Sequence, residues 1–310
     1  MKIQKKLISL IPSKAMLAAM LATTLIGISP CFVKITDIGP NATGFFRMLF
    51  SLFFLVLLTA TQKNVRSYET LSGGEPKFLV VLSGLFLSLD LACWHVSLHY
   101  TEIVNAALFN NMMPVFMPLL VWIFYSQRPN WRFLIAVTFA MLGAAIVTGE
   151  SMSMMLSSFT GDMLAMLAAV FYACYIMVVT RLRKFMPVTR VMAWTTFFCG
   201  LFMLLYAVLS GEKIMLTTKN DWIGTLSLAL LVQTGGQGLL AYAMGYLSET
   251  MISIMVLFST VVSGIAGWIF FGEELGFIQF AGGAIVISSI IYANYVETLT
   301  QRKIANETTS

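Results

Sequence analysis

Asp90 and His95 are two ionisable side chains inside one strongly apolar stretch, residues 78–98. Ionisable groups are costly at membrane depth, so a span that contains them is a functional site by default. Burial favours the neutral form of a carboxyl group. Asp90 is therefore predicted to bind a proton from one side of a membrane and release it on the other, with His95 as a second candidate. The competing interpretation gives Asp90 a structural hydrogen bond to a neighbouring helix or to Arg47.

Two neutral amides lie in another apolar stretch, residues 103–125. Pro114 leaves the carbonyl of Asn110 without its helical hydrogen bond, so the helix is predicted to kink or break there. Freed carbonyls and the amides of Asn110 and Asn111 can hold a polar ligand at membrane depth. The alternative is that both amides only compensate for the hydrogen bond that the proline removes.

Gln233 and Gln237 are four residues apart, so an α-helix places them on one face, and the glycines between them allow close approach of another helix. Aromatic side chains on other apolar stretches add surface against which a ligand can stack, although simple helix packing explains them equally well. The predicted binding site consists of Trp94, Asn110, Asn111, Tyr175, Gln233 and Gln237.

Metal and enzyme sites are not predicted. His95 and His99 have a spacing that suits a metal, but a stable site needs three or four ligands and no second helix carries a matching set. The sequence has no nucleophile elbow, no His-Glu-x-x-His motif and no ATP-binding signature, so no catalytic residue and no cofactor are expected. The cysteines are interpreted as packing residues: Cys31, Cys93, Cys174 and Cys199.

Composition identifies the solvent of these side chains. Hydrophobic residues make up 58% of the chain and charged residues only 11%, against about a quarter charged in soluble domains. The chain is therefore predicted to be an all-α, multi-pass membrane protein with short connections. Ten stretches have the length of about 20 residues that a spanning helix needs: 15–35, 42–61, 78–98, 103–125, 132–149, 162–180, 190–210, 222–244, 250–271 and 277–296.

The positions of the nineteen Lys and Arg residues predict the orientation. Arg47 lies within a span near its outer end, where its side chain either extends outward to the interface or faces the cavity and selects anionic substrates. The other basic residues are distributed unevenly: with the N-terminus inside, fifteen fall on cytoplasmic segments, while the outer side keeps only Lys34, Lys213 and Lys219. This asymmetry follows the positive-inside rule, so both termini are predicted to be cytoplasmic, and the net charge of +5 does not indicate nucleic-acid binding.

The chain contains an internal repeat. Trp122 to Tyr125 returns as Trp268 to Phe271, and Tyr100 and Tyr246 are separated by the same offset. The copies lie five spans apart, and because five is odd the second copy must enter the membrane from the opposite side. The fold is thus predicted to be ten transmembrane helices arranged as two inverted five-helix repeats: residues 1–150, residues 151–300, and a cytoplasmic tail at 301–310.

Both halves carry a set of residues that matches a known family pattern: Pro40, Arg47, Tyr100-Thr101, Asn105-Ala106, Pro114, Gly143, Gly161-Asp162, Gly272 to Leu275, Gln279 and Gly282. With these residues both halves resemble the EamA-type branch of the drug/metabolite transporter superfamily. Departures from that family's pattern occur at Ile26, at Ser126-Gln127 and at Ser289. The resemblance implies ten helices and a central cavity that opens alternately to each side, but no particular substrate.

The predicted function is secondary active transport of a small polar or amphipathic metabolite, an amino acid or a related compound, across a bacterial inner membrane. The expected partners are that substrate and the lipid bilayer, with the protein a monomer or a homodimer. Two alternatives come from other classes: an intramembrane enzyme acting on a lipid or peptide, and a structural scaffold. The identity of the substrate, the direction of transport and the coupling ion are left open by the sequence.

Overall fold

The computed structural model describes residues 2–61, 75–97, 100, 109–148, 159–271 and 277–307, and in these ranges every regular element is a helix. The first half contains α1 (Lys2–Gly27), α2 (Ser29–Lys34), α3 (Pro40–Thr61), α4 (Glu75–Ser97), α6 (Met113–Tyr125) and α7 (Trp131–Thr148). The second half contains α8 (Phe159–Leu182), α9 (Val188–Leu209), α10 (Lys219–Ser227), the π-helix η2 (Leu228–Gln237), α11 (Gly238–Ala243), α12 (Glu249–Val256), α13 (Phe258–Phe271) and α14 (Phe277–Glu307).

Eight helical segments of the described chain are long and apolar enough to cross a bilayer, and each coincides with a predicted span. The fourth and fifth predicted spans coincide with shorter apolar helices, Met113–Tyr125 and Trp131–Val147. The 13 residues of α6 extend about 20 Å, less than the hydrocarbon core of about 30 Å. The predicted start of the fourth span, residues 103–108, lies outside the described residues.

Two of the spans are interrupted at matching places in the two halves. In the fourth span a turn at Asn111 and Met112 precedes α6, and Pro114 occupies the first turn of that helix, as the sequence predicted. In the ninth span α12 ends at Val256 and α13 begins after Leu257. Leu257 follows Asn111 at the same offset that separates the repeated tryptophans. Interrupted apolar segments at corresponding positions of two repeats are a typical feature of transporter binding sites.

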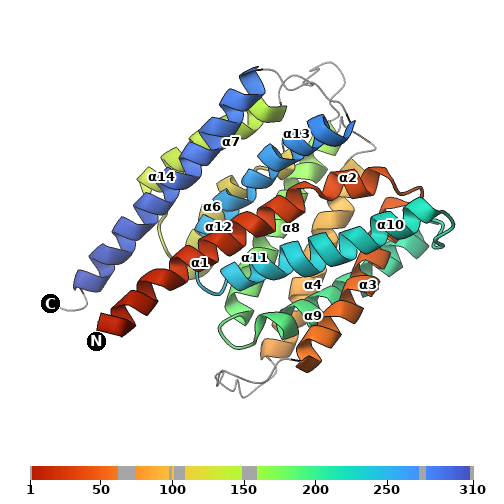
Figure 1. Cartoon of the computed structure of the whole chain (residues 1–310), viewed down its shortest axis with the longest axis horizontal. Coiled ribbons are helices and arrows are strands. Elements are labelled where there is room, and N and C mark those ends of the chain that lie inside the picture. Colours follow the sequence, from red (N-terminus) through yellow and green to blue (C-terminus); the bar gives the residue numbers. More distant parts are fainter. Residues whose placement is uncertain are drawn as a thin grey trace.

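The packing of the helices follows a two-fold pattern. Two contacts join corresponding helices of the two halves, α3 with α9 and α7 with α14, and α6 of the fourth span packs on α12 of the ninth span. The remaining large contacts come in matched pairs, because α4 packs on α8 while α1, the counterpart of α8, packs on η2 and α11. Most of the interior is therefore an interface between the two repeats. Figure 1 shows the α7–α14 pair at one edge of the bundle and α3, α4 and α9 on the opposite side.

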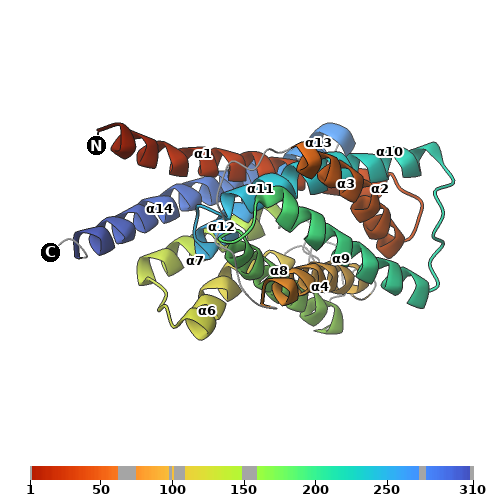
Figure 2. The ribbon, with the colours of Figure 1, turned by 90° about the horizontal axis from the view of Figure 1, so that it is seen from below.

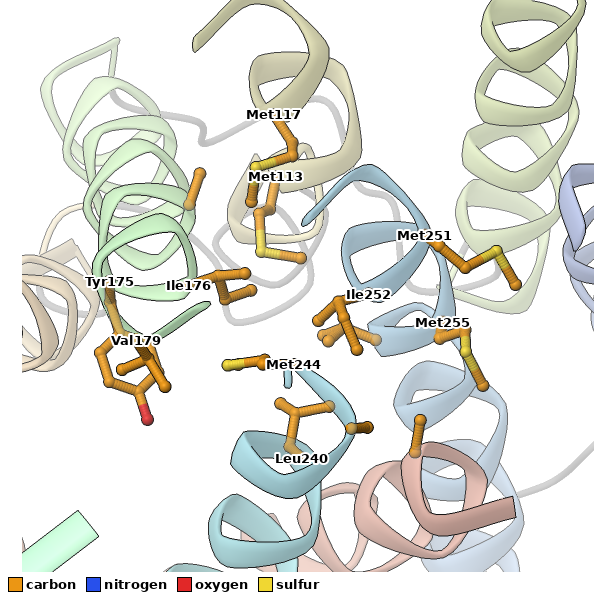
Figure 3. Close-up of a cluster of buried hydrophobic side chains, with 14 of the residues drawn as sticks. Met113, Met117, Tyr175, Ile176, Val179, Leu240, Met244, Met251, Ile252 and Met255 are labelled. Carbon is orange, nitrogen blue, oxygen red and sulfur yellow. The ribbon is translucent and has the colours of Figure 1, made fainter. Parts of the chain in front are cut away.

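The apolar core is rich in methionine, an unbranched residue that fills irregular gaps. Met113 and Met117 of α6 point toward Ile176 of α8 (Figure 3). They also point toward Met244, which directly follows α11, and toward Ile252 of α12. The fourth span therefore packs against helices of the second repeat.

The two ends of the bundle differ in what they carry. The start of α1, the end of α14 and the loop between α6 and α7 lie at one end, whereas the connection from α9 to α10 lies at the other (Figure 2). Arg128, in the connection between α6 and α7, therefore lies at the end that holds both termini. Lys213, in the connection between α9 and α10, lies at the opposite end.

Candidate functional site

A hydrogen-bonded polar chain crosses the interior of the bundle and joins three helices. Arg47 of α3 donates two hydrogen bonds to the side-chain oxygen of Gln233, from Nε at 3.2 Å and from Nη2 at 2.8 Å. Gln233 is fully buried on η2, and its Nε2 donates to the Thr196 hydroxyl of α9 at 3.3 Å. Arg47 belongs to the first repeat, and the other two residues belong to the second. This series of hydrogen bonds is therefore a contact between the two repeats.

A second polar group, centred on Gln237, lies four residues after Gln233 on η2. Gln237 Nε2 donates to the Tyr172 hydroxyl at 3.2 Å, and the rings of Tyr172 and Tyr175 stack with centroids 5.6 Å apart. The Tyr175 hydroxyl and Gln237 Oε1 are both buried, and in the described part of the chain neither has a hydrogen-bond partner. Figure 3 shows that the Tyr175 hydroxyl points away from the methionine cluster. Two unpaired buried polar atoms are thus available to a ligand.

The π-helix explains how the two glutamines are positioned. The sequence predicted that Gln233 and Gln237 share one face of an α-helix, but the structure shows a π-helix, in which hydrogen bonds span five residues. The Thr234 hydroxyl follows the same spacing, donating to the carbonyl of Ala229 at 2.8 Å, and it also lies 2.8 Å from the Ser51 hydroxyl of α3. π-helical segments are rare and occur frequently at functional sites.

Gly236 lets η2 approach α1 closely. A Cβ atom added there would lie 3.3 Å from the backbone oxygen of Ala22 and 3.1 Å from the side chain of Ile26. These contacts are tighter than ordinary van der Waals contact, so a side chain at position 236 requires its neighbours on α1 to shift by a few tenths of an ångström.

Asp90 lies with this cluster, as a predicted site residue. It is buried on α4, with 7% of its surface exposed, and it is close enough to Arg47 for their opposite charges to attract each other. Arg47 donates its hydrogen bonds to Gln233, and no hydrogen bond or ion pair joins it to Asp90 in the described residues. The hydrogen bond to Arg47 that the structural interpretation of Asp90 offered is therefore not formed. His95 lies on α4, but its side chain is outside the described part of the structure.

The remaining predicted site residues are Trp94 on α4 and the two asparagines that precede α6. Trp94 is half-buried one turn after Asp90 on α4, and its carbonyl accepts a hydrogen bond from Ser97. Asn110 and Asn111 lie at the break before α6, where the buried Oδ1 of Asn110 has no partner among the described residues. No hydrogen bond of the described chain connects either asparagine to the Arg47 cluster.

The sequence did not identify Thr196, Tyr172 as a hydrogen-bond partner, or the inward orientation of Arg47. An arginine near the end of a span can extend outward to the interface, and the sequence left this option open. The structure shows Arg47 directed into the bundle toward Gln233. Thr196 has no signal in the sequence, because a threonine in an apolar helix commonly bonds its own backbone.

Two carboxylates of the second repeat hold the backbone of the first repeat at the end of the bundle opposite the termini. Glu212 accepts hydrogen bonds from the Asn41 amide at 2.7 Å and from the backbone N–H of Ala42 at 2.8 Å, at the start of α3. Asp221 is fully buried and accepts from the backbone N–H groups of Asp37, Thr217 and Thr218. We call these two carboxylates, with residues 37–42, the outer clamp.

An open groove lies away from this cluster, between α7 and α14. It has a volume of about 470 Å³ and is lined mostly by apolar side chains that include Phe139 and Ile285. None of the predicted site residues lines it. No group of three or more potential metal ligands occurs in the described ranges, and the four cysteines are free thiols.

Comparison with known proteins places this site in context. An uncharacterized transporter from Archaeoglobus fulgidus is 22% identical over 89% of this chain and 94% of its own length. The uncharacterized transporter YxxF from Bacillus subtilis is 25% identical over 89% of this chain and 90% of its own. A crystal structure with 14% sequence identity matches with a TM-score of 0.77, covering 92% of this chain and 98% of the other, and so shows the same fold.

The model of the EamA-like transporter family matches the sequence twice, over residues 13–149 and 159–295. These two segments divide the chain where its internal repeat divides it, and the polar cluster lies on the surface where the two repeats meet. The resemblance seen in the sequence is thereby confirmed: this membrane protein belongs to the EamA-like transporter family, within the drug/metabolite transporter superfamily.

Proposed function

We propose that this protein is a secondary active transporter that moves a small polar or amphipathic metabolite, an amino acid or a related compound, by alternating access. The observation that carries the proposal is the polar cluster between the repeats, in which Arg47 of one repeat bonds Gln233 of the other. A substrate that binds there contacts both halves at once. Rocking one half against the other then exposes the same site to the two sides of the membrane in turn.

The substrate is proposed to contact the side chains with unused hydrogen-bonding capacity. Gln237 and Tyr175 provide an amide oxygen and a hydroxyl that have no partner among the described residues, and Tyr172 and Tyr175 provide a stacked aromatic surface. At the break of the fourth span, Asn110 provides a further amide oxygen that no described residue bonds. Aromatic surface together with neutral amides suits a small molecule that has both apolar and polar parts.

Asp90 is proposed to couple transport to a proton gradient. It is a buried carboxyl group in the same cluster, and it shares that environment with the titratable or charged groups of Arg47, Tyr172, Tyr175 and Cys199. A carboxyl group that meets water only when the cluster faces one side can gain a proton there and lose it on the other side.

The topology is proposed to comprise ten spans in two inverted repeats, with both termini in the cytoplasm of a bacterial cell. The start of α1 and the end of α14 lie at the same end of the bundle, together with the loop that contains Arg128 (Figure 2). With this end in the cytoplasm, fifteen of the nineteen Lys and Arg residues are assigned to inner segments, as the positive-inside rule requires.

The test is transport by the purified full-length chain in proteoliposomes. A deletion strain is first profiled for metabolites that it accumulates or fails to export, and these compounds are then offered to the liposomes with and without a pH gradient. We expect one chemical class to concentrate inside against its own gradient. Movement of no compound by folded protein would contradict the proposal. Conversion of a compound into a product would instead favour the intramembrane enzyme.

A further inference from the structure

We propose that Arg47 binds a carboxylate group of the transported substrate, with the Tyr175 hydroxyl as a second donor. This inference rests on the proposed transport function and makes it more specific, because it assigns a chemical group to the substrate. It concerns a binding role for an arginine whose side chain the sequence left free to point outward or inward.

The first step is the state of the Arg47 charge. A guanidinium group has five N–H donors and is always protonated in proteins. In the structure its hydrogen bonds go to a single neutral oxygen, that of Gln233. A neutral amide satisfies donors but does not balance a charge, and the carboxyl group of Asp90 attracts Arg47 without a hydrogen bond. The strongest partner for a guanidinium is a carboxylate bound through two parallel hydrogen bonds, and that place is taken by no residue of the described chain.

The second step is the set of groups around Arg47. Tyr172 and Tyr175 lie near enough to interact with its charge, and the buried hydroxyl of Tyr175 has no partner in the described residues. A carboxylate has about four lone-pair positions, so it can accept from the guanidinium and from a phenol together. The stacked rings of these two tyrosines would lie against the apolar remainder of the same molecule.

The third step separates binding from a purely structural role. If Arg47 only links the repeats through Gln233, its removal weakens the protein and affects every ligand equally. If Arg47 binds a carboxylate, its removal affects ligands that carry this group and spares their uncharged analogues. The comparison of matched ligands is therefore decisive, and a loss of stability alone is not.

The experiment uses the full-length protein in detergent and three matched pairs of probes: 3-phenylpropanoate with 3-phenylpropanamide, phenylalanine with phenylalaninamide, and hexanoate with hexanamide. Binding is measured as the concentration of probe that produces half of the maximal rise in the melting temperature of the protein. We expect carboxylates to act on the wild type at concentrations about tenfold to a hundredfold lower than their amides, because hydrogen bonds to charged groups are the strong ones.

Two variants test the assignment. Arg47→Gln should abolish the preference for the carboxylate in each pair, whereas Arg190→Gln, which removes an exposed arginine at the start of α9, should retain it. If Arg47→Gln does not fold, Tyr175→Phe removes only one hydroxyl and should weaken the carboxylates several-fold while leaving the amides unchanged. The proposal is overturned if no carboxylate stabilises the wild type, or if the folded variants keep the full preference.

Failure of this inference is distinguishable from failure of the transport proposal. Concentrative uptake of compounds that all lack a carboxylate would retain the transporter and reject the role of Arg47. Selective binding of carboxylates by a protein that moves no compound would do the reverse.

Discussion

Gln237 has one bonded and one free end, which makes it the most direct residue with which to test the binding site. Its Nε2 is bonded to Tyr172, and its Oε1 is buried with no partner in the described residues. A buried acceptor of this kind is costly unless a ligand or a water molecule satisfies it.

Gln237→Ala is expected to raise the half-saturation concentration for transport about fivefold, since one buried hydrogen bond contributes about 1 kcal/mol. Asn111→Ala should have an effect of the same size if the break in the fourth span faces the substrate. Gln279→Ala is the matched control, because Gln279 is also a buried glutamine whose oxygen has no partner among the described residues, but it lies on α14. Uptake kinetics in proteoliposomes provide the measurement. Unchanged affinity in Gln237→Ala would move the site elsewhere.

Asp90→Asn is expected to abolish accumulation driven by a pH gradient and to leave exchange or downhill flux partly intact. The asparagine keeps the shape and the polarity of the side chain but cannot bind and release a proton. Uptake is compared with and without an imposed gradient at matched protein levels. If the variant still concentrates the substrate, Asp90 is a structural residue and another group carries the coupling.

At the scale of elements, the outer clamp shows how loops fix the ends of helices. A carboxylate at a helix start is favourable because it accepts hydrogen bonds from free backbone N–H groups and complements the positive end of the dipole. Asp221 caps its own helix through Thr218 and also accepts from the backbone of Asp37, 184 positions earlier. Glu212 accepts a hydrogen bond from the backbone N–H of Ala42, at the start of α3 in the other repeat. Both contacts hold one repeat against the other.

Asp221→Ala is expected to reduce the free energy of unfolding by about 2 to 3 kcal/mol, because it removes a cap and leaves buried N–H groups without an acceptor. For a chain of 310 residues that corresponds to a fall of roughly 3 to 5 °C in the melting temperature. Asp37→Ala is the control. Asp37 is exposed, and its carboxylate accepts only a long bond of 3.4 Å from Thr218. Equal melting temperatures for the two variants would show that the clamp contributes no stability.

At the scale of the whole molecule, α9 determines the relative sidedness of two connections. Because α9 is one continuous span of 22 residues, the connection from α8 to α9 and the connection from α9 to α10 lie on opposite sides of the membrane. Arg183 within the first of these connections is buried and bonds the carbonyl of Ala241, so it is a poor position for a labelling reagent. Lys184 and Lys213 are exposed alternatives.

Single cysteines at Lys184 and Lys213, in a chain whose four native cysteines are replaced, are expected to react from opposite sides. Position 213 should be modified by an impermeant maleimide in intact cells, and position 184 only after permeabilisation. The number of modified molecules is read by mass shift on a gel. Modification of position 184 in intact cells would reject the proposed orientation and, with it, the cytoplasmic placement of both termini.

The sequence by itself determined that the helices lie in lipid, that the chain contains an internal repeat, and which polar residues lie within the apolar spans. Long apolar spans and few charges dictate helices in lipid, since only helices satisfy all their backbone groups there without water. The break at Pro114 and the common helix of Gln233 and Gln237 also follow from local rules, because they depend on neighbours within one or two turns.

Only the tertiary structure decided which of these polar residues meet. The bond from Arg47 to Gln233 joins positions 186 residues apart, and the bond from Gln237 to Tyr172 joins positions 65 apart. No periodicity along one helix encodes the rotation of another helix against it, and a span shows equal hydrophobicity whichever side it turns inward. The orientation of Arg47, the π-helix that carries both glutamines, and the outer clamp are set by packing between repeats, where small differences in close contact decide which polar groups find partners.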